Sequence, residues 1–106
     1  MENNLMLLTT LVQEVSAAVE AMVNTYRTMK AIKKQEQLML KDKLKAFQTL
    51  ERTSRIGTLI RESIAEIART QAYIDECHLE GAALSYAMDK LALLDMMLTK
   101  NLEEYR

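Results

Sequence analysis

Apolar residues near the start of the chain recur at alternating intervals of four and three. This spacing places them on one face of an α-helix, in the manner of a coiled-coil seam. The seam consists of Leu8, Val12, Val15, Val19, Met22, Tyr26 and Met29. Because neighbouring apolar residues widen the seam, the pattern favours a helix packed in a bundle over a strict two-stranded coil.

Five polar residues at 33–37 interrupt the seam, and the apolar pattern resumes at Leu40, Leu44 and Phe47. None of the five is Gly or Pro, so we expect one helix over about residues 4–51, and the pattern leaves open a bend or a break near residue 34. A continuous helix of that length would measure about 70 Å. The remaining residues are too few to cover it, which predicts self-association through this helix.

The second half of the chain predicts two further helices. A turn is expected at 52–57, where cap-type residues meet Gly57. Isoleucines then mark a stripe over about 56–79, and Gly81 is expected to end that helix. A last helix over about 82–104 has an apolar stripe that includes Leu91, Leu94, Leu98 and Leu102.

The composition of the chain agrees with a purely helical fold. Proline is absent and only two glycines occur, which leaves little material for hairpins and tight turns. The predicted fold class is all-α: an antiparallel helical bundle or helical hairpin with coiled-coil-like packing and a long first helix. We expect one domain over residues 1–106.

The apolar stripes also predict the class of function. We expect a small protein–protein interaction module, such as an adaptor, assembly factor, chaperone or regulator, that forms a homodimer and binds a protein partner of unknown identity. Binding would bury the stripes of residues 8–29 and 91–102. Methionine adapts to irregular surfaces, so a partner groove and ordinary core filling are both open for Met22, Met29, Met39, Met88, Met96 and Met97.

The stretch DECHLEGA at 75–82 holds the only cysteine and the only histidine of the chain beside three carboxylates, which raises the question of a metal site. On a helix these side chains point in several directions, and only Asp75 and His78, three residues apart, could meet one ion. A carboxylate-bridged di-iron site needs a second histidine. We therefore expect no metal and no cofactor.

Three polar residues fall on or beside the apolar stripes. Gln71 and His78 lie within the isoleucine stripe, and Asp95 lies at the edge of the last stripe. Polar groups on a packed face can fix register or oligomeric state, so these are candidate specificity positions, with ordinary boundary residues as the alternative. Since histidine titrates near neutral pH, His78 is also a candidate pH sensor.

Basic residues gather in the middle of the chain. Residues 30–55 hold eight basic against three acidic side chains, a net charge of +5, whereas the second half is acidic. The candidate basic patch comprises Lys30, Lys33, Lys34, Lys41, Lys43 and Lys45. It supports an alternative function, a nucleic-acid-binding helical dimer, although acidic neighbours and a single nearby aromatic residue make nucleic acid the less favoured partner.

Other classes of protein find little support in the sequence. A glycine-rich phosphate loop and a nucleophile beside a placed base are both missing, so we do not expect an enzyme. One cysteine and a start without a secretory pattern predict a cytoplasmic protein. No uninterrupted apolar run reaches the roughly 18 to 20 residues of a membrane span, so no membrane contact is expected.

Overall fold

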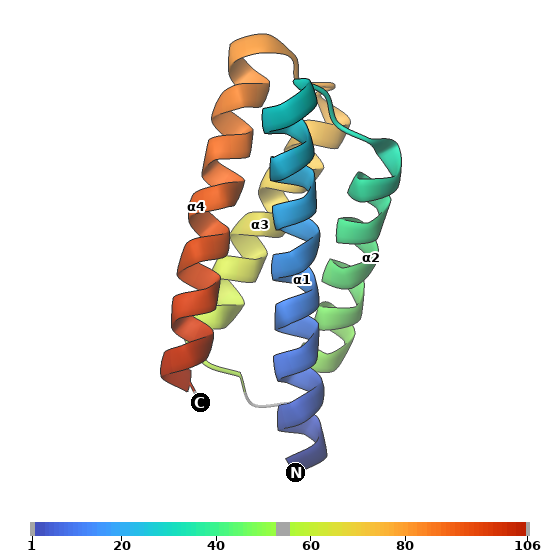
Figure 1. Ribbon diagram of the computed structural model, residues 1–106. Helices are drawn as coiled ribbons and strands as arrows, with labels where there is room; N and C mark the ends of the chain where they lie inside the picture. Colours follow the sequence, from blue (N-terminus) through green and yellow to red (C-terminus); the bar gives the residue numbers. More distant parts are fainter. Residues whose placement is uncertain (1, 53–55, 106) are drawn as a thin grey trace.

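The computed structural model describes residues 2–52 and 56–105, with side chains from Met6 onward. Over these residues the chain forms four helices and no strand: α1 (Glu2–Met29), α2 (Lys34–Glu51), α3 (Thr58–Glu76) and α4 (Gly81–Tyr105). They run alternately up and down in a bundle of 44 × 22 × 19 Å (Figure 1). The predicted all-α antiparallel bundle is confirmed.

The helices form a closed square in which each contacts two others. Helix α1 packs against α2 and α4, and α3 packs against α4, whereas α2 and α3 meet over a smaller interface. The first and last helices are therefore neighbours, and both ends of the described chain lie at the same end of the bundle (Figure 1). In this arrangement the outer face of the α1/α2 pair lies opposite the outer face of the α3/α4 pair.

A single helix over residues 4–51 is not what the structure shows, because the chain turns back between Met29 and Lys34. The break falls at the start of the polar interval in the seam. Lys30 adopts a left-handed backbone conformation with φ of 54°, and its N–H donates to the carbonyl of Tyr26 at 2.7 Å. This geometry is the αL type of helix ending, here without a glycine.

Burial of apolar side chains explains why the chain breaks where no glycine or proline demands it. A left-handed residue with a side chain costs about 1–2 kcal/mol. Folding back buries Leu40, Leu44 and Phe47 of α2, and each such side chain contributes about 1.5–3 kcal/mol when removed from water. The gain exceeds the strain several times over, so two helices are more stable than one long, half-covered helix.

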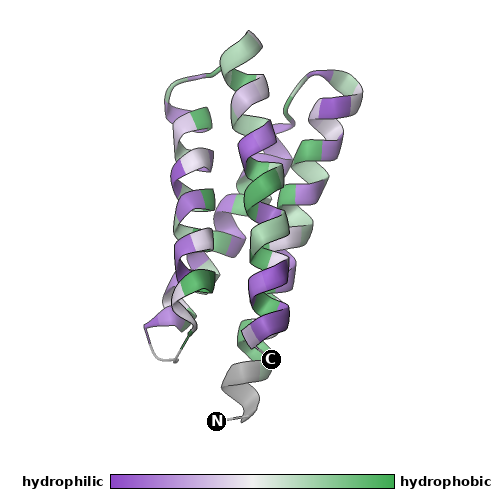
Figure 2. Cartoon of the chain, turned by 90° about the vertical axis from the view of Figure 1, so that its left-hand side faces the viewer, coloured by the Kyte–Doolittle hydropathy of each residue, from purple (hydrophilic) through white to green (hydrophobic). Residues whose placement is uncertain are grey.

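The core of the bundle is built from the residues that were predicted to meet a partner. The structure buries the following seam residues within the single chain: Leu8, Val12, Val15, Val19, Met22, Leu91, Leu94, Leu98 and Leu102. Tyr26 is half-buried and Met29 is exposed. The prediction that these stripes are open to a partner is therefore wrong, because α2 and α3 cover the area that a second chain was expected to cover. Along each helix apolar and polar positions alternate with the helical period (Figure 2).

Residues Met6–Met29 of α1 have the length and apolar composition of a membrane-spanning helix. The core helix of a bundle can meet the same two criteria, so this is weak evidence. In this fold the most apolar side of that segment faces the other helices, with Val15, Val19 and Met22 fully buried.

The end of α3 also differs from the prediction. Helix α3 stops at Glu76, and His78, rather than Gly81, takes the left-handed position after it, with φ of 48°. The N–H of Leu79 donates to the carbonyl of Ile74 at 3.4 Å, which is the long hydrogen bond of a Schellman ending. Gly81 instead begins α4, also with a positive φ, of 57°.

The predicted turn at 52–57 joins α2 to α3. Helix α2 ends at Glu51 and α3 begins at Thr58, on either side of that turn, while residues 53–55 lie outside the described residues.

Separate substitutions at the two left-handed positions of this connection, His78 and Gly81, should change the free energy of unfolding in opposite directions. His78→Gly should raise the free energy of unfolding by about 1 kcal/mol, since glycine adopts this conformation without steric cost. Gly81→Ala should lower it by a similar amount of about 1 kcal/mol because of φ alone, since a Cβ there meets no atom within 4 Å. Urea unfolding at neutral pH measures both, with His78→Ala as the control that keeps a side chain. Equal stability of the Gly and Ala variants at position 78 would contradict this account of the helix ending.

Candidate binding groove between α3 and α4

The three predicted specificity positions differ in burial in the structure. Gln71 on α3 and Asp95 on α4 are buried, as the apolar stripes indicate. His78 is exposed, because α3 ends two residues before it and its backbone turns away from the helical path. The prediction that His78 points inward from the isoleucine stripe is therefore wrong, and with it the argument for a pH sensor at that residue.

Asp95 lies at the contact between α4 and α1. Its carboxylate accepts a hydrogen bond from the hydroxyl of Ser16, and its side chain is only 6% exposed. The pKa of Asp95 is raised to about 6, mainly by burial and also by the nearby Glu20 carboxylate, while the hydrogen bond from Ser16 acts in the opposite direction. The carboxyl group therefore changes its charge near neutral pH inside a helix–helix contact.

The lysines of the candidate basic patch do not form one uncompensated surface. Lys43 pairs with Glu14 at 2.7 Å, and Lys41 approaches Asp75 at 3.6 Å. Lys30 lies over the ring of Tyr26, 5.5 Å from its centroid. Acidic residues of other helices thus offset part of the positive charge, and nucleic-acid binding stays a prediction.

A hollow on the described surface lies between the outer sides of α3 and α4. It has a volume of about 490 Å³, within the range of ligand-binding clefts. Tyr73 of α3 and Tyr86 of α4 stand at one end of this groove and are 55% and 73% exposed. The small side chains Ala83 and Ala87 line its α4 side, and their size leaves the space between the helices open.

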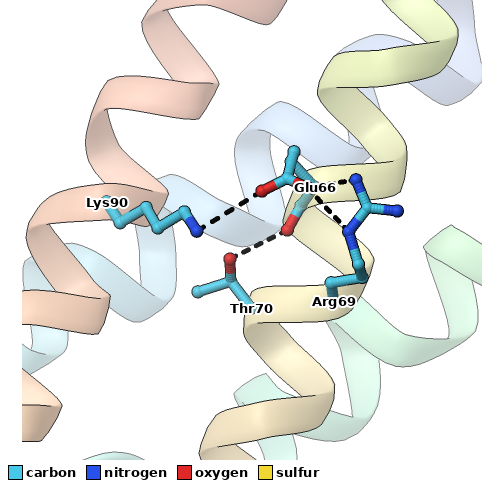
Figure 3. A network of polar contacts seen from close by, with 4 residues as sticks. All are labelled: Glu66, Arg69, Thr70 and Lys90. Carbon is cyan, nitrogen blue, oxygen red and sulfur yellow. Dashed lines mark hydrogen bonds and ion pairs between the residues drawn. The ribbon is translucent and has the colours of Figure 1, made fainter.

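Charged residues form the other end of the groove (Figure 3). The Glu66 carboxylate accepts a hydrogen bond from Nε of Arg69 at 2.6 Å and pairs with Nζ of Lys90, from α4, at 3.3 Å. The hydrogen bonds from Arg69 and Lys90 lower the pKa of Glu66. The hydroxyl of Thr70 donates to the backbone carbonyl of Glu66 at 2.8 Å. The ion pair between Glu66 and Lys90 thus joins α3 to α4 at the middle of the pair.

Exposed apolar residues extend this surface toward the other end of the bundle. Leu59, Glu66 and Tyr73 are seven residues apart and so share one stripe of α3. Tyr86, Lys90, Leu93 and Met97 follow intervals of four, three and four along α4. We call these two stripes together the α3/α4 face: Leu59, Glu66, Tyr73, Tyr86, Lys90, Leu93 and Met97. Leu59 and Leu93 are both 57% exposed, and Met97 is 47% exposed, so the face is apolar on both sides of a central ion pair.

Most of this surface was missed by the sequence analysis. The predicted binding residues came from the inward-facing apolar stripes, whose residues fill the core. Leu59, Tyr73 and Tyr86 lie instead on the outward-facing stripes of α3 and α4. A signal was available in Leu59 and Tyr73, two large apolar residues fourteen positions apart on the side of α3 away from the isoleucines. Of the methionines, Met22 and Met88 are buried and Met97 belongs to the α3/α4 face.

The DECHLEGA stretch does not assemble a group of metal ligands in the described part of the chain. Within residues 2–52 and 56–105, no group of three His, Cys, Asp or Glu side chains could hold a metal ion. Cys77 is a free, exposed cysteine, and Asp75 is directed to Lys41. What the geometry offers is a partly apolar groove with an ion pair, which suits binding by shape and burial.

No family model matches the sequence, no curated protein is similar to it, and no solved structure matches the fold.

The buried carboxyl of Asp95 should make stability depend on pH. Its pKa in the folded chain is about 6, against an ordinary value of 3.8, so the folded state binds this proton more tightly than the unfolded state. The contribution of this carboxyl group to the free energy of unfolding is therefore fully present below about pH 4. It is lost as the pH rises through 6, which lowers the free energy of unfolding by on the order of 2 kcal/mol.

Asp95→Asn should remove that loss of stability while keeping an acceptor for Ser16. We expect the variant to be more stable than the wild type at pH 7.5, by on the order of 2 kcal/mol, and to lose that advantage near pH 4. Thermal unfolding across this pH range is the measurement, and Asp89→Asn, at an exposed position of the same helix, is the control. A pH profile that is unchanged by Asp95→Asn would contradict the assignment.

Proposed function

We propose that this protein is a small helical protein–protein interaction module that binds its partner through the α3/α4 face. The observation that carries the proposal is the groove itself, in which Tyr73 and Tyr86 are exposed beside small residues that keep the space open. Tyrosine is enriched among the residues that dominate binding energy at protein interfaces, because it buries a large rigid ring and retains a hydroxyl for hydrogen bonding.

The composition of the face supports a protein partner. Large apolar side chains lie exposed at both ends, Tyr73 at one and Leu59 at the other, and a contiguous exposed apolar surface on a folded domain commonly marks an interaction site. Charged groups lie between them, in the Glu66 and Lys90 pair. An apolar area interrupted by a few fixed polar groups is the usual composition of a specific protein interface.

The proposed binding surface, the α3/α4 face, differs from the surface that the sequence predicted. The seam of residues 8–29 now lies in the core, so the partner would meet outward residues of α3 and α4. The proposal covers an adaptor, a chaperone and a regulator alike. In each of these roles the chain presents a rigid two-helix face to its partner.

Substitution of the two tyrosines tests the proposal. The tagged wild-type chain and a Tyr73→Ser/Tyr86→Ser variant are used as baits in an extract of the source cell, and each captured protein is then purified and titrated directly. Loss of two aromatic contacts should weaken binding about tenfold or more, since such residues each contribute upward of 1 kcal/mol. Binding is measured by calorimetry.

A matched control is available on α2. Leu38→Ser/Met39→Ser removes two apolar side chains of similar exposure, 49% and 55%, from another side of the bundle. This variant should bind like the wild type. If the tyrosine variant and the wild type bind every purified partner equally, the α3/α4 face is not the binding surface.

A further inference from the structure

We propose that the partner of the α3/α4 face is a second copy of the same chain, related by a two-fold axis parallel to the helices. This inference rests on the proposed function, because it names the occupant of the same surface. It is drawn from the order of side chains along the two helices, which makes the face complementary to itself.

Three levels can be distinguished along the face. At the level nearest the turn between the helices, seven residues from Glu66 and from Lys90, Tyr73 and Ala83 line the groove together with Tyr86. At the middle level Glu66 pairs with Lys90. The antiparallel register continues beyond them, since moving seven residues from Glu66 gives Leu59 and moving seven residues from Lys90 gives Met97.

A two-fold axis parallel to the helices brings equal levels together. It places α3 of one copy against α4 of the other without shifting either along the axis. In the register set by the ion pair, Leu59 then faces Met97 of the second copy, Glu66 faces Lys90 of the second copy, and Tyr73 faces Ala83 of the second copy. These contacts join apolar side chains or opposite charges.

The other way of placing the two faces together is unfavourable. A two-fold axis perpendicular to the helices, crossing the face at the level of the ion pair, would set α3 against α3, with Glu66 opposite Glu66 and Lys90 opposite Lys90 of the second copy. Like charges placed together across an interface oppose association. Charge complementarity therefore selects the parallel arrangement, in which Glu66 can pair within its own chain and across the interface.

The dimensions of the face are sufficient for a reversible dimer. Helix α3 has 19 residues and is about 29 Å long at 1.5 Å per residue. With a bundle width of 22 Å, the face offers on the order of 600 Å² per copy, near the lower limit for specific complexes. The apolar ends supply most of the affinity, and the central pair fixes the register, because exposed ion pairs contribute little energy by themselves.

Charge reversal in mixed samples tests this arrangement. Glu66→Lys and Lys90→Glu each place like charges opposite one another at two symmetric positions of the dimer. Each variant alone should therefore dimerise about tenfold or more weakly than the wild type. In an equimolar mixture of the two variants every cross-chain pair joins opposite charges again, so dimerisation should return to within about threefold of wild type. Sedimentation equilibrium at several concentrations up to high micromolar measures all four samples.

A control pair lies on the opposite side of the bundle. Glu14 and Lys43 form an ion pair between α1 and α2 whose side chains are each 37% exposed, close to the 37% and 42% of Glu66 and Lys90. Glu14→Lys and Lys43→Glu should leave the dimer unchanged. Circular dichroism and thermal melts verify that all four variants fold.

The possible results separate this inference from the proposed function. Loss of dimer in the single variants and its return in the mixture support the two-fold dimer. A wild-type chain that stays monomeric overturns it, as does a dimer that tolerates both reversals or a loss that mixing does not repair. The proposed function is decided separately, since a different protein that binds the wild type and not the tyrosine variant would uphold the face after the dimer had failed.

Discussion

The structure depends on one constraint, that the apolar stripe of α1 must be covered along its whole length. A continuous helix over residues 4–51 could not meet this requirement, because the apolar side chains of its second half would lie far from those of its first half. The left-handed turn at Lys30 brings Leu40, Leu44 and Phe47 back onto the bundle. Once α1 and α2 are paired, the two later helices complete the square, and the outward sides of α3 and α4 remain exposed.

Polar residues inside the bundle link helices that are distant in sequence. Ser16 reaches Asp95 across the α1/α4 contact, and the side-chain amide of Asn101 donates to the hydroxyl of Ser63 at 3.2 Å across the α3/α4 contact. Buried hydrogen bonds have strict geometric requirements, so they discriminate against shifted packings of the same helices more strongly than apolar contacts do. The carboxyl of Asp95 achieves this at a cost in stability at neutral pH, since its charged form is poorly hydrated there.

Helical content and inward-facing residues could be predicted from the sequence, whereas the course of the chain and the binding surface could not. The isoleucine stripe of α3 and the leucine stripe of α4 have a clear helical period and are buried as expected. The polar interval at 33–37 left open a break near residue 34, but it did not predict a full reversal, because Lys30 is an ordinary helix former and the turn is imposed by packing. His78 is exposed because α3 ends two residues before it, in a Schellman ending. Tyr73 and Tyr86 were not predicted as surface binding residues. An apolar residue on an outward stripe can be interpreted as an exposed contact only after it is known that the inward stripe is covered within the chain.

Both ends of the described chain lie at the same end of the bundle, and the turn between α3 and α4, with the tyrosines beside it, lies at the opposite end (Figure 1). This gives the molecule a direction. A domain or tag joined at either end would stand off one pole, while the aromatic part of the groove projects from near the other, 44 Å being the full length between them. The length of the bundle therefore separates anything joined at its ends from the turn between α3 and α4.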